Sequence, residues 1–118
     1  MGIDVEKITC KQDAIILVDM ILNLDEKNSI KGISEQDMLM VVTLIFSIKE
    51  SFYKLINNFP EINLDFNVIS LLKFNRNNYV IRINKTINSK FTHGLTIKGF
   101  YVNTPTSIIT LLLESNYS

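Results

Sequence analysis

The spacing of the apolar residues changes at Phe59-Pro60, and this change constrains the fold more than any other feature of the sequence. Before the proline, apolar residues recur every three or four positions as in an amphipathic helix, whereas after it they alternate with polar residues as in a half-buried strand. The residue before a proline is disfavoured in the helical region, so a long helix should end here. With 118 residues, the chain is expected to form one globular domain, 1–118, with a helical first half and a sheet-forming second half.

Two helices are predicted in the first half. The segment Thr9-Cys10-Lys11-Gln12 has the form of a capping box, so a first helix should begin there and run to about Leu24 with most of its circumference buried. Ser34 can cap a second helix, which should end at Asn57 or Asn58.

The second helix carries one stripe of polar positions, which we expect to face solvent while the rest of this central helix is buried. Glu50 and Lys54 are an i, i+4 pair on this stripe, and such an exposed pair contributes only about 0.3 kcal/mol. The polar positions are Thr43, Ser47, Glu50, Ser51, Lys54 and Asn58.

Short strands are predicted at the amino terminus and throughout the second half. Ile3 to Ile8 can form an edge strand or an ordered arm, because apolar and acidic residues alternate there. The strand after Pro60 should contain a bulge or break near Val68 and Ile69, where the alternation slips. An asparagine-rich turn over 75–78 and a second turn over 88–90 separate the strands expected over 62–74, 79–84 and 95–101.

The last element is predicted to be a helix. Thr104-Pro105 reads as a cap followed by a proline at the first helical position, so a helix over Pro105–Glu114 should pack on the sheet. The expected fold class is therefore α+β, with two N-terminal helices, an antiparallel meander of three or four strands, and a C-terminal helix on the sheet.

Composition excludes several classes of site. One cysteine and one histidine, Cys10 and His93, allow neither an internal disulfide nor a zinc site. No glycine-rich phosphate loop and no trusted catalytic motif is present, so we expect no cofactor, no bound metal and no enzymatic activity. The first residues do not form a secretory signal, which suggests a cytoplasmic protein, and an isoleucine- and asparagine-rich composition suggests a phage, virus or other mobile element.

The charges are unevenly distributed although the net charge is zero. Residues 1–66 hold eleven acidic and six basic residues, whereas residues 67–118 hold six basic residues and one acidic residue. This asymmetry favours a protein that binds another macromolecule through a charged surface, unless the two sets neutralise each other within the fold. The acidic surface would consist of Asp19, Asp25, Glu26, Glu35 and Asp37.

The function predicted from this pattern is a small non-enzymatic protein-binding module. A toxin-neutralising immunity protein, or a phage or viral inhibitor that blocks a partner protein, would use the acidic surface in this way. The oligomeric state is left open. No membrane partner is expected, because the chain has neither a long apolar segment nor a net positive charge.

Two alternatives remain open. The first is nucleic-acid binding through the basic sheet, although few aromatic residues are available there for base stacking. The second is an enzyme that uses Cys10 as a nucleophile, with His93 as its base if the fold brings the two together. The basic residues of the first alternative are Lys73, Arg76, Arg82, Lys85, Lys90 and Lys98.

Overall fold

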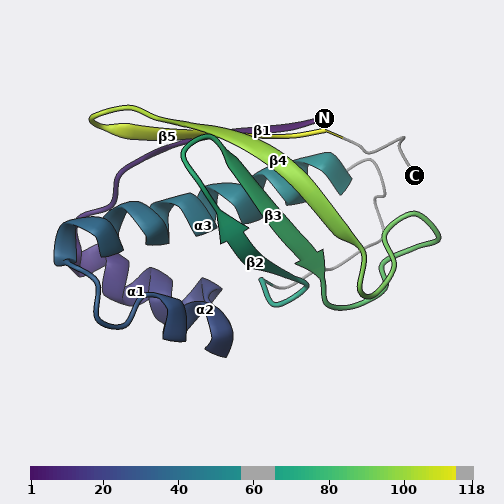
Figure 1. Ribbon diagram of the computed structural model, residues 1–118, viewed down its shortest axis with the longest axis horizontal. Helices are drawn as coiled ribbons and strands as arrows, with labels where there is room; N and C mark the ends of the chain where they lie inside the picture. The colour runs from purple at the N-terminus through teal and green to yellow at the C-terminus, as the bar shows by residue number, and fades with distance from the viewer. Residues whose placement is uncertain (57–65, 114–118) are drawn as a thin grey trace.

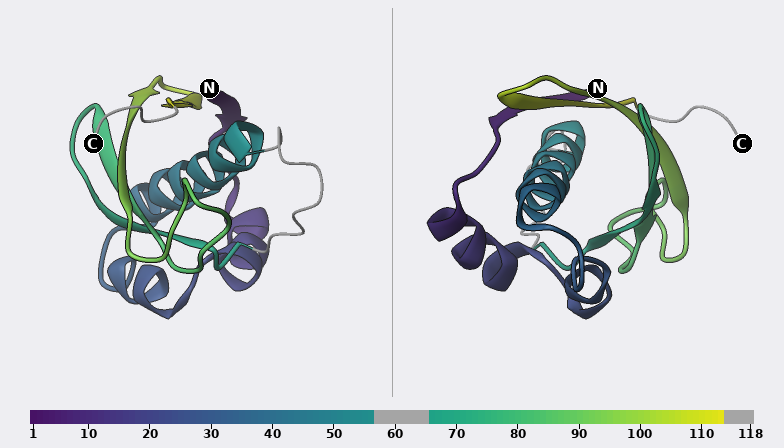
Figure 2. Two further views of the ribbon diagram at one scale, coloured as in Figure 1. Left: turned by 90° about the vertical axis from the view of Figure 1, so that its right-hand side faces the viewer. Right: turned by 60° about the vertical axis from the view of Figure 1, so that its left-hand side comes forward.

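The computed structural model describes residues 1–56 and 66–113. A five-stranded antiparallel sheet curves around one long helix, α3 (Glu35–Ile56), and two short helices lie on the other side of that helix (Figures 1 and 2). The strand order is β1-β5-β4-β3-β2, so the first strand is an edge strand, and the predicted α+β class is confirmed. The other elements are β1 (Gly2–Lys7), α1 (Lys11–Ile21), α2 (Leu24–Ser29), β2 (Ile69–Phe74), β3 (Asn78–Ile83), β4 (Thr96–Asn103) and β5 (Ser107–Leu112).

Helix α3 is the central element, as its apolar pattern predicts. Ser34 caps it by accepting a hydrogen bond from the backbone N–H of Asp37 at 3.1 Å. The expected solvent-facing stripe is wrong in part, because Thr43, Ser47 and Ser51 are buried against the rest of the fold. Small hydroxyl side chains can be buried when each finds a hydrogen-bond partner. The predicted end of the helix at 57 or 58 lies outside the described residues.

The first predicted helix is in fact two helices. Helix α1 ends at Ile21, and Asn23 starts α2 through a reciprocal capping box with Glu26. Thr9 is not a helix cap, because its backbone N–H donates to Thr43 Oγ1 at 2.9 Å and Cys10 occupies the cap position without a side-chain hydrogen bond. The expectation of a mostly buried helix is also wrong, since α1 exposes Ile15, Ile16 and Met20.

The predicted C-terminal helix is a strand. The Thr104 hydroxyl accepts from the backbone N–H of Ser107 at 2.9 Å, and this bond belongs to a tight turn between β4 and β5 rather than to a helix start. Strand β5 then pairs with β1 on one side and β4 on the other. Ile108, Thr110 and Leu112 are all buried, so the two-residue period governs this segment and the proline marks a turn.

The remaining strand predictions are largely confirmed. The amino-terminal segment is a strand at the sheet edge, and strands β2, β3 and β4 form the expected meander. The turn after Phe74 is held by the Asn75 side chain, which accepts from the backbone N–H groups of Asn77 and Asn78. The irregularity in β2 lies between Leu71 and Lys73 rather than near Val68, and the strand predicted from residue 62 falls partly outside the described residues.

Candidate active site

Strand β1 and helix α3 lie in unusually close contact. A Cβ atom placed on Gly2 would be 1.9 Å from the backbone oxygen of Ser51, so only glycine allows this approach. A buried seam of hydroxyl groups lies next to it, in which Thr110 of β5 bonds to Ser47 Oγ at 2.8 Å and to Ser51 Oγ at 2.5 Å. The small side chains of this seam let the sheet pack directly on the helix backbone.

This close contact brings four charged side chains together. Gly2, Asp4 and Glu6 share the face of β1 that points toward α3, because alternate residues of a strand face the same way. Lys54 Nζ of α3 lies 2.8 Å from Asp4 Oδ1, and Glu50 lies one helical turn before Lys54. The Asp4 side chain is only 4% exposed, whereas that of Lys54 is 52% exposed.

The pKa of Glu6 is raised from 4.5 to about 7, first by burial and then by the neighbouring carboxylates of Asp4 and Glu50, against a smaller opposite effect of Lys54. The pKa of Glu50 is raised for the same reasons, burial first and then Asp4. The pKa of Lys54 is raised chiefly by its hydrogen bond to Asp4. The site therefore holds more negative charge than its one ammonium group offsets.

The donor set fits a hard divalent cation. Carboxylate oxygens are the ligands that Mg²⁺ prefers, and Asp4 Oδ2 is buried without a hydrogen-bond partner among the described residues. Within the described residues no three acidic, histidine or cysteine side chains yet surround a common point. A cation would thus bind at Asp4 once the half-buried Glu6 or Glu50 side chain turns toward it.

A hollow of about 450 Å³ opens beside Glu6. It lies between the start of α1, the end of β1 and the middle of α3, and its wall is mainly apolar. Ile16, Leu17 and Phe46 provide apolar side chains, while Thr9 and Thr43 provide hydroxyl groups. The charged cluster therefore borders a space that can receive an uncharged chain.

A family model supplies the class of protein. The model described as the 4'-phosphopantetheinyl transferase superfamily matches residues 1–106, a span that includes β1, α3 and the whole charged cluster. The chain belongs to this superfamily. No curated protein sequence matches the chain.

Membership of the phosphopantetheinyl transferase superfamily overturns the predicted function. The family is one of enzymes that transfer a group, so the predictions of a non-enzymatic module, an immunity protein and an inhibitor are wrong. A protein partner remains consistent with this superfamily, but nothing supports a toxin as that partner. No helix in the described part of the chain has the length and apolar character needed to cross a membrane.

The predicted acidic surface does not coincide with the cluster of Asp4, Glu6, Glu50 and Lys54. Glu26 is 2% exposed and forms an ion pair with Lys49 at 2.8 Å, so it is not available on the surface. Asp19 and Glu35 are exposed and form pairs with Lys27 and Lys11. Asp25 and Asp37 are also exposed, each in the first turn of a helix. A partner-binding role for the four exposed acids stays a prediction.

The basic residues of the second half are exposed, apart from the partly exposed Arg82, and lie on the strands and loops of the meander. Four ion pairs join described side chains, and in each of them both residues belong to the first 54 positions. Whether the basic surface binds nucleic acid stays untested.

Cys10 and His93, the residues of the predicted dyad, lie on different parts of the fold. Cys10 is exposed at the start of α1, whereas His93 belongs to the loop between β3 and β4. That loop lies at the opposite end of the molecule from the start of α1 (Figure 1). The geometry therefore gives no support to a Cys-His mechanism.

The sequence contains two patterns that belong to the cluster. Asp4 and Glu6 stand two residues apart in a strand whose first inward residue is Gly2, and Glu50 and Lys54 stand one helical turn apart. Each pattern alone is typical of a solvent-exposed surface. Only the pairing of β1 with β5, which places β1 over α3, shows that the two patterns face each other.

Proposed function

We propose that the protein transfers a 4'-phosphopantetheinyl group from coenzyme A to a hydroxyl group of a carrier protein. The observation that carries the proposal is the convergence of Asp4, Glu6, Glu50 and Lys54 at the contact between β1 and α3. Family membership names the group that is transferred, and the cluster, once its carboxylates hold a divalent cation, would suit a diphosphate substrate.

The reaction is a phosphoryl transfer. The oxygen of a carrier-protein hydroxyl attacks the phosphorus atom that bears the pantetheine arm, and the bond from this phosphorus to the bridging oxygen of the diphosphate breaks. The carrier keeps the phosphopantetheinyl group as a phosphodiester, and adenosine 3',5'-bisphosphate leaves. The hydroxyl loses its proton, and negative charge develops on the bridging oxygen.

Each residue of the cluster has a distinct role in this reaction. Glu6 accepts the hydroxyl proton, because a carboxylate whose pKa is about 7 is well matched to general-base catalysis near neutral pH. Lys54 is partly exposed and can turn its ammonium group from Asp4 to the diphosphate oxygens. Asp4 and Glu50 would hold a divalent cation, which supplies positive charge against the diphosphate.

The hollow beside Glu6 suits the remainder of the donor. The pantetheine arm is an uncharged chain with two amide groups, and the wall of the hollow combines apolar side chains with the Thr9 and Thr43 hydroxyls. Placing the arm there would direct the diphosphate toward Glu6 and Lys54. A Leu17→Asp change in this wall should therefore raise KM for coenzyme A with little effect on kcat.

The test is transfer of a fluorescent coenzyme A derivative to an apo carrier protein in the presence of Mg²⁺. Asp4→Asn, Glu50→Gln and Lys54→Met should each lower kcat/KM at least a hundredfold, because each removes charge that acts on the transferred phosphoryl group. Lys27→Met is the matched control, since it also removes one partly exposed lysine from an ion pair, and it should retain full activity.

The outcomes separate clearly. Loss of transfer in the three cluster variants, with normal folding and an active control, supports the proposal. Absence of transfer by the wild-type protein to any apo carrier protein tested, or full activity of the Asp4→Asn variant, would contradict it.

A further inference from the structure

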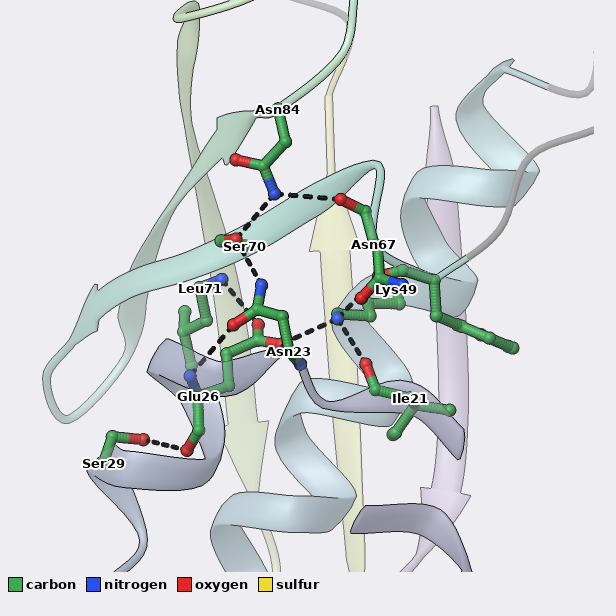
Figure 3. A network of polar contacts seen from close by, with 10 residues as sticks. Ile21, Asn23, Glu26, Ser29, Lys49, Asn67, Ser70, Leu71 and Asn84 are labelled. Atoms are coloured by element: carbon green, nitrogen blue, oxygen red, sulfur yellow. Dashed lines mark hydrogen bonds and ion pairs between the residues drawn. The ribbon is translucent and has the colours of Figure 1, made fainter. Parts of the chain in front are cut away.

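We infer that the buried ion pair between Lys49 and Glu26 is a positioning device that fixes the rotation of α3, and with it the placement of Glu50 and Lys54 in the active site. The inference rests on the proposed function, because it concerns how that site is held. It assigns a role to the most extensive polar network of the interior, which the reaction itself does not use (Figure 3).

The Lys49 ammonium group connects three separate segments to α3. It donates to the Ile21 backbone oxygen at the end of α1 at 2.5 Å, to Glu26 Oε1 of α2 at 2.8 Å, and to the Phe66 backbone oxygen at 2.7 Å. Its side chain is 2% exposed and that of Glu26 is 1% exposed. An ammonium group has three donors, and all three are used here by fixed groups.

The Glu26 carboxylate is held as firmly as its partner. Oε1 also accepts from the Asn23 backbone N–H at 3.0 Å, and Oε2 accepts from the Leu71 backbone N–H of β2 at 2.8 Å. Asn23 in turn contacts Ser70 of β2 (Figure 3). The ion pair therefore ties α3 to the end of α1, to α2 and to the far edge of the sheet.

The position of Lys49 on the helix explains why this tie matters for the site. Successive residues of an α-helix are rotated by about 100°. Glu50 and Lys54 are thus about 100° and about 140° around the axis from Lys49, while Ser47 and Ser51 are about 160° and about 200° from it. The two reactive residues lie between two anchors on opposite sides of the helix, one at α2 and one at the hydroxyl seam of β5.

Small rotations of α3 would be sufficient to disturb catalysis. Side-chain ends lie roughly 6 Å from a helix axis, so a rotation of about 10° moves the Glu50 carboxylate by about 1 Å. A misplacement of this size can lower the rate of an enzyme by about a hundredfold. Removing the anchor at Lys49 leaves the hydroxyl seam, the hydrogen bond between Thr9 and Thr43 and the apolar packing of α3 to oppose rotation.

The test compares three variants with the wild-type protein. Lys49→Met removes the ammonium group alone, which leaves Glu26 charged and buried and can prevent folding. The double variant Glu26→Gln/Lys49→Met removes both charges, and its amide oxygen can still accept from one of the two N–H groups, those of Asn23 and Leu71, that donate to Glu26. No charge is left buried, so this variant should fold. Ile97→Ala in β4 is the control for loss of stability, since it empties part of the core without touching either anchor.

Two measurements report the placement of the site without any transferase assay. The first is the set of nuclear Overhauser contacts between the side-chain protons of Lys54 and Asp4, which should be lost in the double variant while those between Ser51 and Thr110 persist. The second is the affinity of the free protein for Mn²⁺, which should fall at least tenfold in the double variant. Ile97→Ala should retain the contacts and the affinity.

A folded double variant that keeps the Lys54 to Asp4 contacts and binds Mn²⁺ as the wild-type protein does would overturn the inference. Equal losses in Ile97→Ala would also overturn it, because they would reflect general destabilisation. If the wild-type protein proves unable to transfer the phosphopantetheinyl group, the proposed function fails, but the contacts of Lys54 still decide whether Lys49 and Glu26 position α3.

Discussion

Replacing Glu6 with glutamine should stabilise the fold above pH 7 while it impairs catalysis. The pKa of Glu6 rises from 4.5 to about 7 on folding, so the folded state binds more protons than the unfolded state between these values. The free energy of unfolding must therefore fall as the pH rises through this window and stay lowered above it. At 1.36 kcal/mol per pKa unit, the full difference corresponds to about 3 kcal/mol, and partial exposure reduces this to about 1 to 2 kcal/mol.

Glutamine has nearly the same shape as glutamate, carries no charge and can donate a hydrogen bond to the Asp4 carboxylate, as the protonated glutamic acid would. Thermal unfolding followed by circular dichroism should give a Tm about 4 to 8 °C higher for Glu6→Gln than for the wild-type protein at pH 8.5. At pH 4 the two curves should nearly coincide, because Glu6 is then protonated in both the folded and the unfolded chain. Glu35→Gln, at an exposed carboxylate, should shift Tm by no more than about 1 °C.

The pH dependence of the difference is what tests the reasoning. If Glu6→Gln has the wild-type Tm at pH 8.5, or if its advantage is equally large at pH 4, Glu6 does not carry an unfavourable charge in the folded protein. The proposed general base would then lack the raised pKa on which that role depends.

Three further predictions follow from the packing around the site. Gly2→Ala should lower transferase activity at least tenfold in the carrier-protein assay, because the new Cβ would collide with the Ser51 backbone oxygen and push β1 from α3. Thr110→Val should lower the free energy of unfolding by about 1 to 3 kcal/mol in urea titrations, since it leaves the buried Ser47 and Ser51 hydroxyls without their shared partner. Asn75→Ala should lower the free energy of unfolding by about 1 kcal/mol and leave activity unchanged. Its side chain holds the turn between β2 and β3, and β2 is the edge strand opposite β1 in the sheet.

The fold could be predicted from the sequence where local signals agree with the tertiary structure. Ser34 caps the central helix, and the alternation of Tyr79, Ile81 and Ile83 correctly predicts a strand with one buried face. The error at Pro105 has a definite cause, because Thr-Pro suits both a helix start and a turn. The choice between them depends on the gap between β1 and β4, which β5 fills and which no local pattern reveals.

The active site could not be predicted because β1 reverses the usual rule for a half-buried strand. Ile3 and Val5 are 47% and 59% exposed, while Asp4 is buried and Glu6 is partly buried. The alternation of apolar and acidic residues in such a strand predicts that the apolar side chains face the core and the acidic side chains face solvent. This strand does the opposite, and a strand that buries its charges is less stable than one that buries its apolar side chains.

The same reversal argues that the cluster is functional rather than structural. A fold selected only for stability would have no reason to place Asp4, Glu6 and Glu50 together with a single partly exposed lysine, since burial and then the neighbouring carboxylates raise the pKa values of Glu6 and Glu50 and so disfavour their charged forms. The contrast with Lys49 and Glu26 is instructive, because that pair is more deeply buried on one side of the same helix yet satisfies the donors and acceptors of both groups. Helix α3 thus bears a balanced charge pair that can hold it in place and, about 100° away, an unbalanced cluster whose excess negative charge an external cation would offset.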